Sequence, residues 1–191
     1  MRYRMHLQGL AVTSAVLLLV GCEKDPAHLH EGHPQELITT VLVHVWNEPD
    51  STHVHRFAFR DLDGPGGNPP RVDTIHFHGH DTLWRLRLDF LNEAVSPPDT
   101  ITKEIRNEAT THQVFYDVQP QNLFTVERLD KDANGLPLGL EARVRLQHSH
   151  REARGSLRIR LMHYHHEGEK TTQPGGETDV DVTFPVHILP D

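Results

Sequence analysis

Histidine is the residue type whose number and spacing in this chain could do chemistry, since it accounts for 17 of 191 residues. Many of the histidines are two positions apart, and on a β-strand such residues project from the same face with Cα atoms about 6–7 Å apart. Two neutral imidazoles placed in this way can bind one zinc ion at about 2.0–2.1 Å each. The groups with this spacing are His28/His30, His53/His55, His76/His78/His80, His148/His150 and His163/His165, with His166 next to the last pair. The alternative interpretation is that each pair is solvated at a strand end or bonded to backbone.

A second candidate site combines carboxylates with imidazoles. Glu104, Glu108 and His112 are four residues apart and would share one face of a helix, and we group His163 with them. Imidazole and carboxylate ligands suit zinc, copper(II) or nickel, so these four residues predict a transition-metal site. The alternative is an ordinary salt-bridged helix face with His112 packed on a sheet.

A third candidate site has the residue spacing of a calcium-binding loop. The segment D-x-D-x-N-G-x5-E fits this spacing, with its side-chain ligands at Asp130, Asp132, Asn134 and Glu141. The flanking segments 124–129 and 142–146 read as strands, however, which argues against the helices of an EF-hand. We therefore interpret the segment first as a tight Asn-Gly turn between strands and second as a weak calcium site.

Composition restricts the remaining chemistry. The single cysteine excludes an intrachain disulfide and a thiolate zinc site, and only 3 methionines disfavour a thioether copper(I) site. The net charge of −8 argues against a nucleic-acid partner, which requires a basic surface. No nucleophile-elbow, HExxH or P-loop motif is present, so the sequence predicts no enzyme activity.

The N-terminal segment predicts the compartment. Arg2 and Arg4 precede an apolar run at 10–20 that is too short to cross a bilayer, which is typical of a secretory signal. The run ends in Leu-Val-Gly-Cys22, which looks like a bacterial lipobox and explains the lone cysteine. We expect a signal peptide over 1–21, lipidation at Cys22, a flexible tether over 22–36, and anchoring to the outer membrane on the cell surface, with the periplasmic face as the alternative.

The elements that must position these residues are strands. From about residue 37 apolar residues alternate with polar ones, and Gly- and Pro-containing turns separate the runs. This pattern predicts an all-β fold: one domain over 37–191, an Ig-like antiparallel β-sandwich of seven to nine strands. Pro97 and Pro98 interrupt the alternation, and we expect one short inserted helix over about 100–111, with Thr102 as its cap.

Several segments together resemble a family of Bacteroidota surface lipoproteins often catalogued as type 1 periplasmic binding fold superfamily proteins. The segments are Glu36–Val41, Asp61–Gly64, Leu91–Glu93, Ile101–Ile105, Glu108–Tyr116, Asp130–Leu140 and Gly175–Asp179. The resemblance covers nearly the whole chain after Cys22 and implies work beside TonB-dependent outer-membrane receptors. The family's label implies two α/β lobes, whereas this chain offers one strand-rich domain.

Metal capture is the function that accounts for the histidines, the anchor and the expected fold together. We expect a surface lipoprotein that binds a divalent transition metal, zinc first and copper(II) or nickel as alternatives, and delivers it to a TonB-dependent receptor. A docking module without a metal is the first alternative. The second is a copper/zinc superoxide-dismutase-like enzyme, which His53 and His55 suggest but which would need a disulfide.

Overall fold

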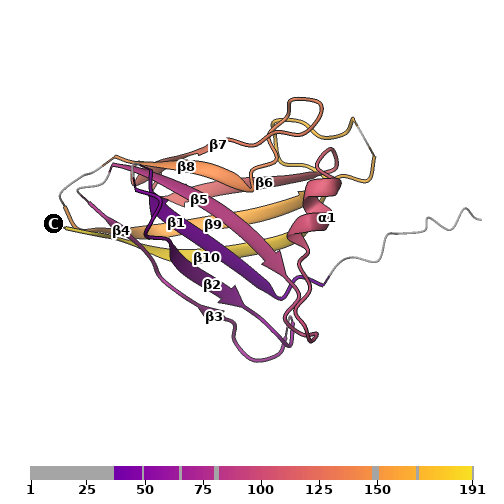
Figure 1. Ribbon diagram of the computed structural model, residues 1–191, viewed down its shortest axis with the longest axis horizontal. Helices are drawn as coiled ribbons and strands as arrows, with labels where there is room; N and C mark the ends of the chain where they lie inside the picture. Colours follow the sequence, from indigo (N-terminus) through magenta and orange to yellow (C-terminus); the bar gives the residue numbers. More distant parts are fainter. Residues whose placement is uncertain are drawn as a thin grey trace, which may run out of the picture. The chain divides into compact units, whose positions relative to one another are not determined.

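The chain folds into two β-sheets that pack face to face, as seen in a computed structural model (Figure 1). The structure describes residues 37–48, 50–64, 66–79, 82–147, 151–166 and 168–190. In these ranges the strands are β1 (Thr40–Asn47), β2 (His55–Arg60), β3 (Arg71–Val72), β4 (Ile75–His78), β5 (Leu83–Leu91), β6 (His112–Gln119), β7 (Phe124–Arg128), β8 (Glu141–Leu146), β9 (Ala153–His163) and β10 (Glu177–Leu189). The expected all-β sandwich is confirmed. It has more strands than the seven to nine expected, partly because β3 is only two residues long.

The two sheets differ in size and in the direction of one strand pair. One sheet has the order β3-β2-β1-β5-β8-β7 and the other has the order β4-β10-β9-β6. All neighbouring strands are antiparallel except β4 and β10, which run parallel. The alternation of side chains did not predict this parallel pair, because alternation fixes which face a residue occupies but not the direction of its neighbour.

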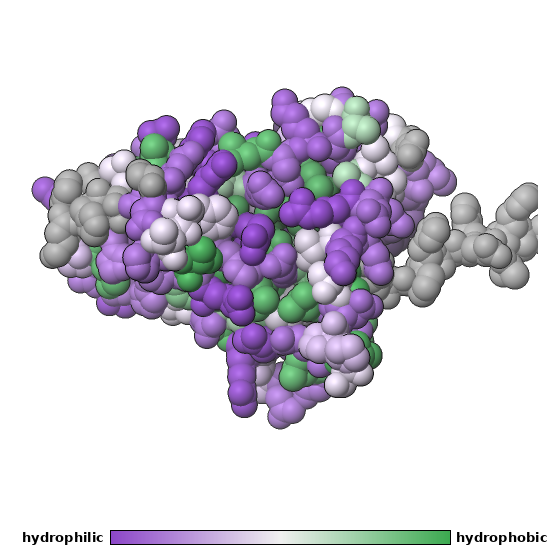
Figure 2. All heavy atoms as spheres, viewed as in Figure 1, coloured by the Kyte–Doolittle hydropathy of each residue, from purple (hydrophilic) through white to green (hydrophobic). Residues whose placement is uncertain are grey.

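The apolar residues of alternating strands meet between the sheets. Val43 of β1, Leu88 of β5, Ile159 of β9 and Phe184 of β10 are fully buried there. Each contributes apolar surface that leaves water on folding, which is the main force that holds the sheets together. The visible outer face is correspondingly hydrophilic, with small separated hydrophobic areas (Figure 2).

The inserted helix α1 (Thr102–Asn107) is shorter than the expected span of about 100–111. The sequence suggested that the hydroxyl of Thr102 caps the helix, but it makes no capping hydrogen bond. It accepts a hydrogen bond from the amide of Phe90 at 2.7 Å and so fastens the helix to β5. Turn residues follow the helix, and the next strand starts at His112. No helix in the described part of the chain has the length and apolar character needed to cross a membrane.

Candidate metal centre

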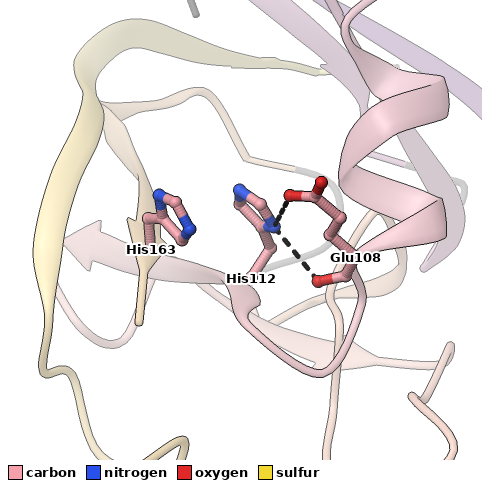
Figure 3. Close-up of side chains that lie close together, drawn as sticks. All are labelled: Glu108, His112 and His163. Atoms are coloured by element: carbon pink, nitrogen blue, oxygen red, sulfur yellow. Dashed lines mark hydrogen bonds and ion pairs between the residues drawn. The ribbon is translucent and has the colours of Figure 1, made fainter. Parts of the chain in front are cut away.

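Glu108, His112 and His163 form the one group of three potential metal ligands found among the described residues (Figure 3). One ligand atom of each side chain lies within 4.8 Å of those of the other two. Glu108 directly follows α1, His112 begins β6 and His163 ends β9. The cluster therefore sits where one helix end meets two strand ends.

Strand register brings the two imidazoles together. β6 and β9 are antiparallel, and His112 is the Cα partner of His163 at the end of the ladder. Their rings stack with centroids 4.4 Å apart and planes 12° from parallel. His163 has the same parity along β9 as the buried Leu161, so both imidazoles extend the inner face of the sheet to its rim.

His112 is the most constrained member of the cluster, with a side chain only 7% exposed. Its Nδ1 lies 3.1 Å from the backbone carbonyl oxygen of Glu108 and 4.0 Å from the carboxylate of the same residue. Its Nε2 lies 3.9 Å from the carboxylate of Asp179, which is 10% exposed. Carboxylates thus lie on both sides of this one imidazole.

The surroundings of His112 favour the neutral form of its ring. Burial lowers its pKa, and the hydrogen bond to the carbonyl of Glu108 opposes that shift without cancelling it. The nearby His163 adds to the lowering, because two positive rings would repel. A neutral imidazole is the form that binds a metal ion, so the surroundings of His112 favour ligation near neutral pH.

Binding of an ion requires a small rearrangement of this cluster. Ligand atoms around a tetrahedral zinc are about 3.4 Å apart, and the rings of His112 and His163 are stacked with their planes 12° from parallel. A nitrogen lone pair lies in the plane of its own ring, so two nearly parallel stacked rings cannot both point at one ion. We therefore expect one imidazole, the half-buried His163, to rotate as the ion binds, while His112 keeps its place.

A more exposed pair adjoins the cluster. The ring of His165 lies 6.0 Å from that of His163, and its Nε2 is 3.2 Å from a carboxylate oxygen of Glu177. Glu177 is in turn the Cα partner of His163 on β10. The side chains of this pair are more than half exposed, so potential ligands extend from the solvent to the buried His112.

The other predicted ligands of the helix and of the chain after β9 do not join the cluster. Glu104 lies in the first turn of α1 and stays outside the group of three. The expectation that Glu104, Glu108 and His112 share a helix face fails, because the helix ends at Asn107 and His112 belongs to a strand. His166 is exposed beyond β9, and its backbone amide donates a hydrogen bond to a carboxylate oxygen of Glu169 at 3.3 Å.

The histidines predicted on other strands lie on the surface. His53 precedes β2 and His55 begins it; both are exposed, and His53 pairs with Asp50 at 3.1 Å. His76 and His78 are exposed on β4, opposite the buried Ile75 and Phe77. Six further residues that the sequence predicts as metal ligands or as the lipidation site lie outside the described ranges: Cys22, His28, His30, His80, His148 and His150. The expected signal peptide over 1–21 and tether over 22–36 also lie outside them.

The segment with calcium-loop spacing uses its carboxylates to fix its own backbone. Asp130 accepts hydrogen bonds from the amides of Gly139, Leu140 and Glu141, at 2.8, 3.0 and 3.2 Å. Asp132 accepts from the amides of Asn134 and Leu136 at 2.9 Å each. The four predicted ligands Asp130, Asp132, Asn134 and Glu141 do not form a metal-ligand group in the described structure. The interpretation as a turn between β7 and β8 accounts for these contacts.

A buried lysine lies beside this turn. The Nζ of Lys170 lies 2.9 Å from the carboxylate of Asp132, and the two side chains are 1% and 0% exposed. The same Nζ donates a hydrogen bond to the carbonyl of Ala109 at 2.8 Å. Because Ala109 follows Glu108, this ion pair connects the turn to the metal-ligand cluster.

Sequence reasoning missed two residues of this region. Asp179 approaches His112 because the register of β9 and β10 shifts between Thr178 and Val180. Such a bulge leaves no clear signal in a single sequence. Lys170 lies in the connection between β9 and β10 and belongs to no periodic pattern, so nothing in the sequence indicated its burial.

Comparison of the chain with protein-family models, with curated proteins and with solved structures gives no match. The resemblance to surface lipoproteins therefore stays a prediction, and the function has to be argued from the cluster itself.

Proposed function

We propose that this protein binds a divalent transition-metal ion, zinc first, through Glu108, His112 and His163. The observation that carries the proposal is the convergence of the three side chains from two strand ends and one helix end within 4.8 Å. A carboxylate and two imidazoles form a ligand set typical of zinc, and three protein ligands leave a fourth position open to water or to an acceptor. Copper(II) and nickel also suit such ligands.

We further propose that the domain carries this ion at the bacterial surface. The lipobox-like segment ending at Cys22 supports a lipid anchor in the outer membrane, and an open coordination position suits an ion that is passed on. The recipient we propose is a TonB-dependent receptor. The exposed His165 and Glu177 support such a transfer, because they give an entering or leaving ion a second contact beside His163.

His112 offers a choice of ligating nitrogen, and the two carboxylates around it favour one. If the ion replaces the proton on Nδ1, the hydrogen bond from this nitrogen to the backbone carbonyl of Glu108 is lost. The ion then lies on the side of the Glu108 carboxylate, and Nε2–H points toward the carboxylate of Asp179, 3.9 Å away. A carboxylate that accepts the second ring N–H is the usual support of a metal-bound histidine. We therefore assign Asp179 the role of a positioning residue.

Calorimetric titration of the full chain with Zn²⁺ tests the proposal. We expect one site in the wild-type chain whose affinity falls about 100-fold or more in Glu108→Ala and in His163→Ala, since each loses one of three ligands. Asp179→Asn should lose about tenfold, as expected for a residue that supports a ligand. His166→Ala is the matched control, because this exposed histidine lies outside the group. Unchanged binding in both ligand variants would refute the site, and absence of binding would favour a docking module.

Zinc affinity should also fall when the pH is lowered from 7.5 to 5.5. A proton competes with the ion for each imidazole, and a histidine with a pKa near 6.5 costs roughly tenfold in affinity over this range. Burial lowers the pKa of His112, so its own contribution should be smaller than tenfold. We expect a total loss between roughly tenfold and 100-fold, measured by titration at both pH values. An affinity that does not change with pH would exclude imidazole ligands.

A further inference from the structure

A second pair of imidazoles lies near the far end of β10, where β4 runs beside it. His76 on β4 and His187 on β10 are Cα partners in the parallel part of the sheet. The residues before them, Ile75 and Val186, are buried in the core, so both histidines face outward from the same sheet surface. The two residues are more than one hundred positions apart in sequence, and no pair spacing along the chain could have predicted their meeting.

The two rings have a geometry that suits shared coordination. Their centroids are 5.7 Å apart and their planes are inclined by 56°. Two imidazoles on one zinc or copper ion have centroids about 5 Å apart at a tetrahedral angle and about 6 Å apart as that angle opens. The inclined planes allow both lone pairs to point at one ion, unlike the stacked rings of His112 and His163. Phe57 packs edge-on against His76 at 6.0 Å and restricts that ring.

A carboxylate supports one of the two rings. The Nε2 of His187 lies 2.9 Å from a carboxylate oxygen of Glu152, and the His187 side chain is 15% exposed. The same carboxylate oxygen accepts hydrogen bonds from Arg154, which holds it in place. A carboxylate that accepts Nε2–H leaves Nδ1 of the ring as the ligand, which is the usual arrangement around metal-bound histidine.

We propose that His76 and His187 form a second metal site, for a divalent transition-metal ion that prefers imidazole, with Glu152 as the positioning residue of His187. Two protein ligands leave the rest of the coordination sphere to water, so this site is weaker than a site with three ligands and exchanges its ion readily. Copper(II) should bind it most tightly, because this ion heads the affinity order for nitrogen ligands.

The second site cannot share an ion with the first. His163 is paired with Glu177 at the start of β10, and His187 lies ten residues further along the same strand. At about 3.3 Å per residue the two sites are roughly 30 Å apart. The two sites are thus separate, and the second one does not rest on the function proposed for Glu108, His112 and His163.

The test uses Cu²⁺ and the full chain carrying His112→Ala and His163→Ala, so that the first cluster cannot contribute. We expect that adding His76→Ala or His187→Ala to this chain weakens the tightest remaining Cu²⁺ site at least tenfold, measured by competition with a chelator. Glu152→Gln should weaken it about tenfold. Electron paramagnetic resonance of the bound Cu²⁺ should show nitrogen couplings that both histidine variants reduce.

The matched control is His53→Ala, because His53 is an exposed histidine that belongs to neither ring pair. This substitution should leave the Cu²⁺ affinity unchanged. Equal affinity in the parent chain and in both His76→Ala and His187→Ala would overturn the proposal, whatever the first cluster does. A loss in His53→Ala as large as that in His76→Ala would also overturn it, since binding would then be spread over the exposed histidines.

Discussion

Replacing Asp132 with alanine should lower the free energy of unfolding by about 3–5 kcal/mol, because it leaves the ammonium of Lys170 buried without its carboxylate. The two groups are 2.9 Å apart and almost completely inaccessible to water. Burial lowers the pKa of Lys170, and the hydrogen bond that its ammonium donates to Asp132 only partly opposes this shift, so the charged form of Lys170 depends on the carboxylate of Asp132. Equilibrium unfolding in urea, compared with the wild-type chain, measures the loss.

A double-mutant cycle separates the ion pair from the other bonds of Asp132. The combined variant Asp132→Ala/Lys170→Met should recover a large part of the stability lost in Asp132→Ala, because it buries no unpaired charge. Glu127→Ala is the control for an exposed pair: Glu127 is 65% exposed beside Arg143 and should cost at most about 1 kcal/mol. A loss below about 1 kcal/mol in Asp132→Ala would mean that water reaches Lys170 and that the pair does not hold the loops.

The location of this ion pair places a positive charge beside the segment that has calcium-loop spacing. A lysine ammonium supplies the positive charge beside one carboxylate oxygen of Asp132, and the backbone amides of Asn134 and Leu136 donate hydrogen bonds to the other oxygen. The second bond of Lys170, to the carbonyl of Ala109, fastens the turn after α1 from which Glu108 projects. The ion pair of Asp132 and Lys170 therefore helps to fix the backbone next to Glu108, one of the proposed metal ligands.

The sequence was sufficient for the fold class because alternation is a local property. Trp84, Leu86, Leu88 and Phe90 are buried on one face of β5, as their spacing predicts. The neighbours of each strand were not predictable in this way. Which strand pairs with which, and in which direction, depends on contacts between residues far apart in the chain, and the parallel pair of β4 and β10 is the clearest case.

The three residues of the candidate site were predicted from the sequence, but partly for a mistaken reason. The sequence grouped Glu108 and His112 as neighbours on a helix, whereas a turn between α1 and β6 brings them together. His163 joins the group through the register of β6 and β9, which, like the other strand pairings, the sequence alone did not predict. The approach of Asp179 to His112 depends on a bulge in β10, and the meeting of His76 and His187 depends on a parallel strand pair. Neither feature can be predicted from one sequence.

His112→Ala should abolish the stabilisation of the fold by zinc. At a zinc concentration of 100 times the dissociation constant, binding adds about 2.7 kcal/mol to the free energy of unfolding of the wild-type chain. A variant that binds at least 100-fold more weakly gains about 0.4 kcal/mol or less at that concentration. The measurement is unfolding in urea with and without zinc, and the quantity compared is the zinc-dependent difference within each variant. This difference does not include the cost of removing a buried ring, because that cost is present in both conditions.

Two further variants decide what that result means for the cluster. His166→Ala should keep the full zinc-dependent gain, since His166 is exposed and outside the group of three ligands. Asp179→Asn should keep about half of it, because a tenfold loss of affinity reduces the gain to about 1.4 kcal/mol. If His112→Ala retained the wild-type gain, the stabilising ion would have to lie elsewhere, and the convergence of α1, β6 and β9 would have a purely structural role. If His112 is a buried ligand supported by the carboxylate of Asp179, the zinc-dependent gain in the free energy of unfolding should decrease from the wild-type chain to Asp179→Asn and again to His112→Ala.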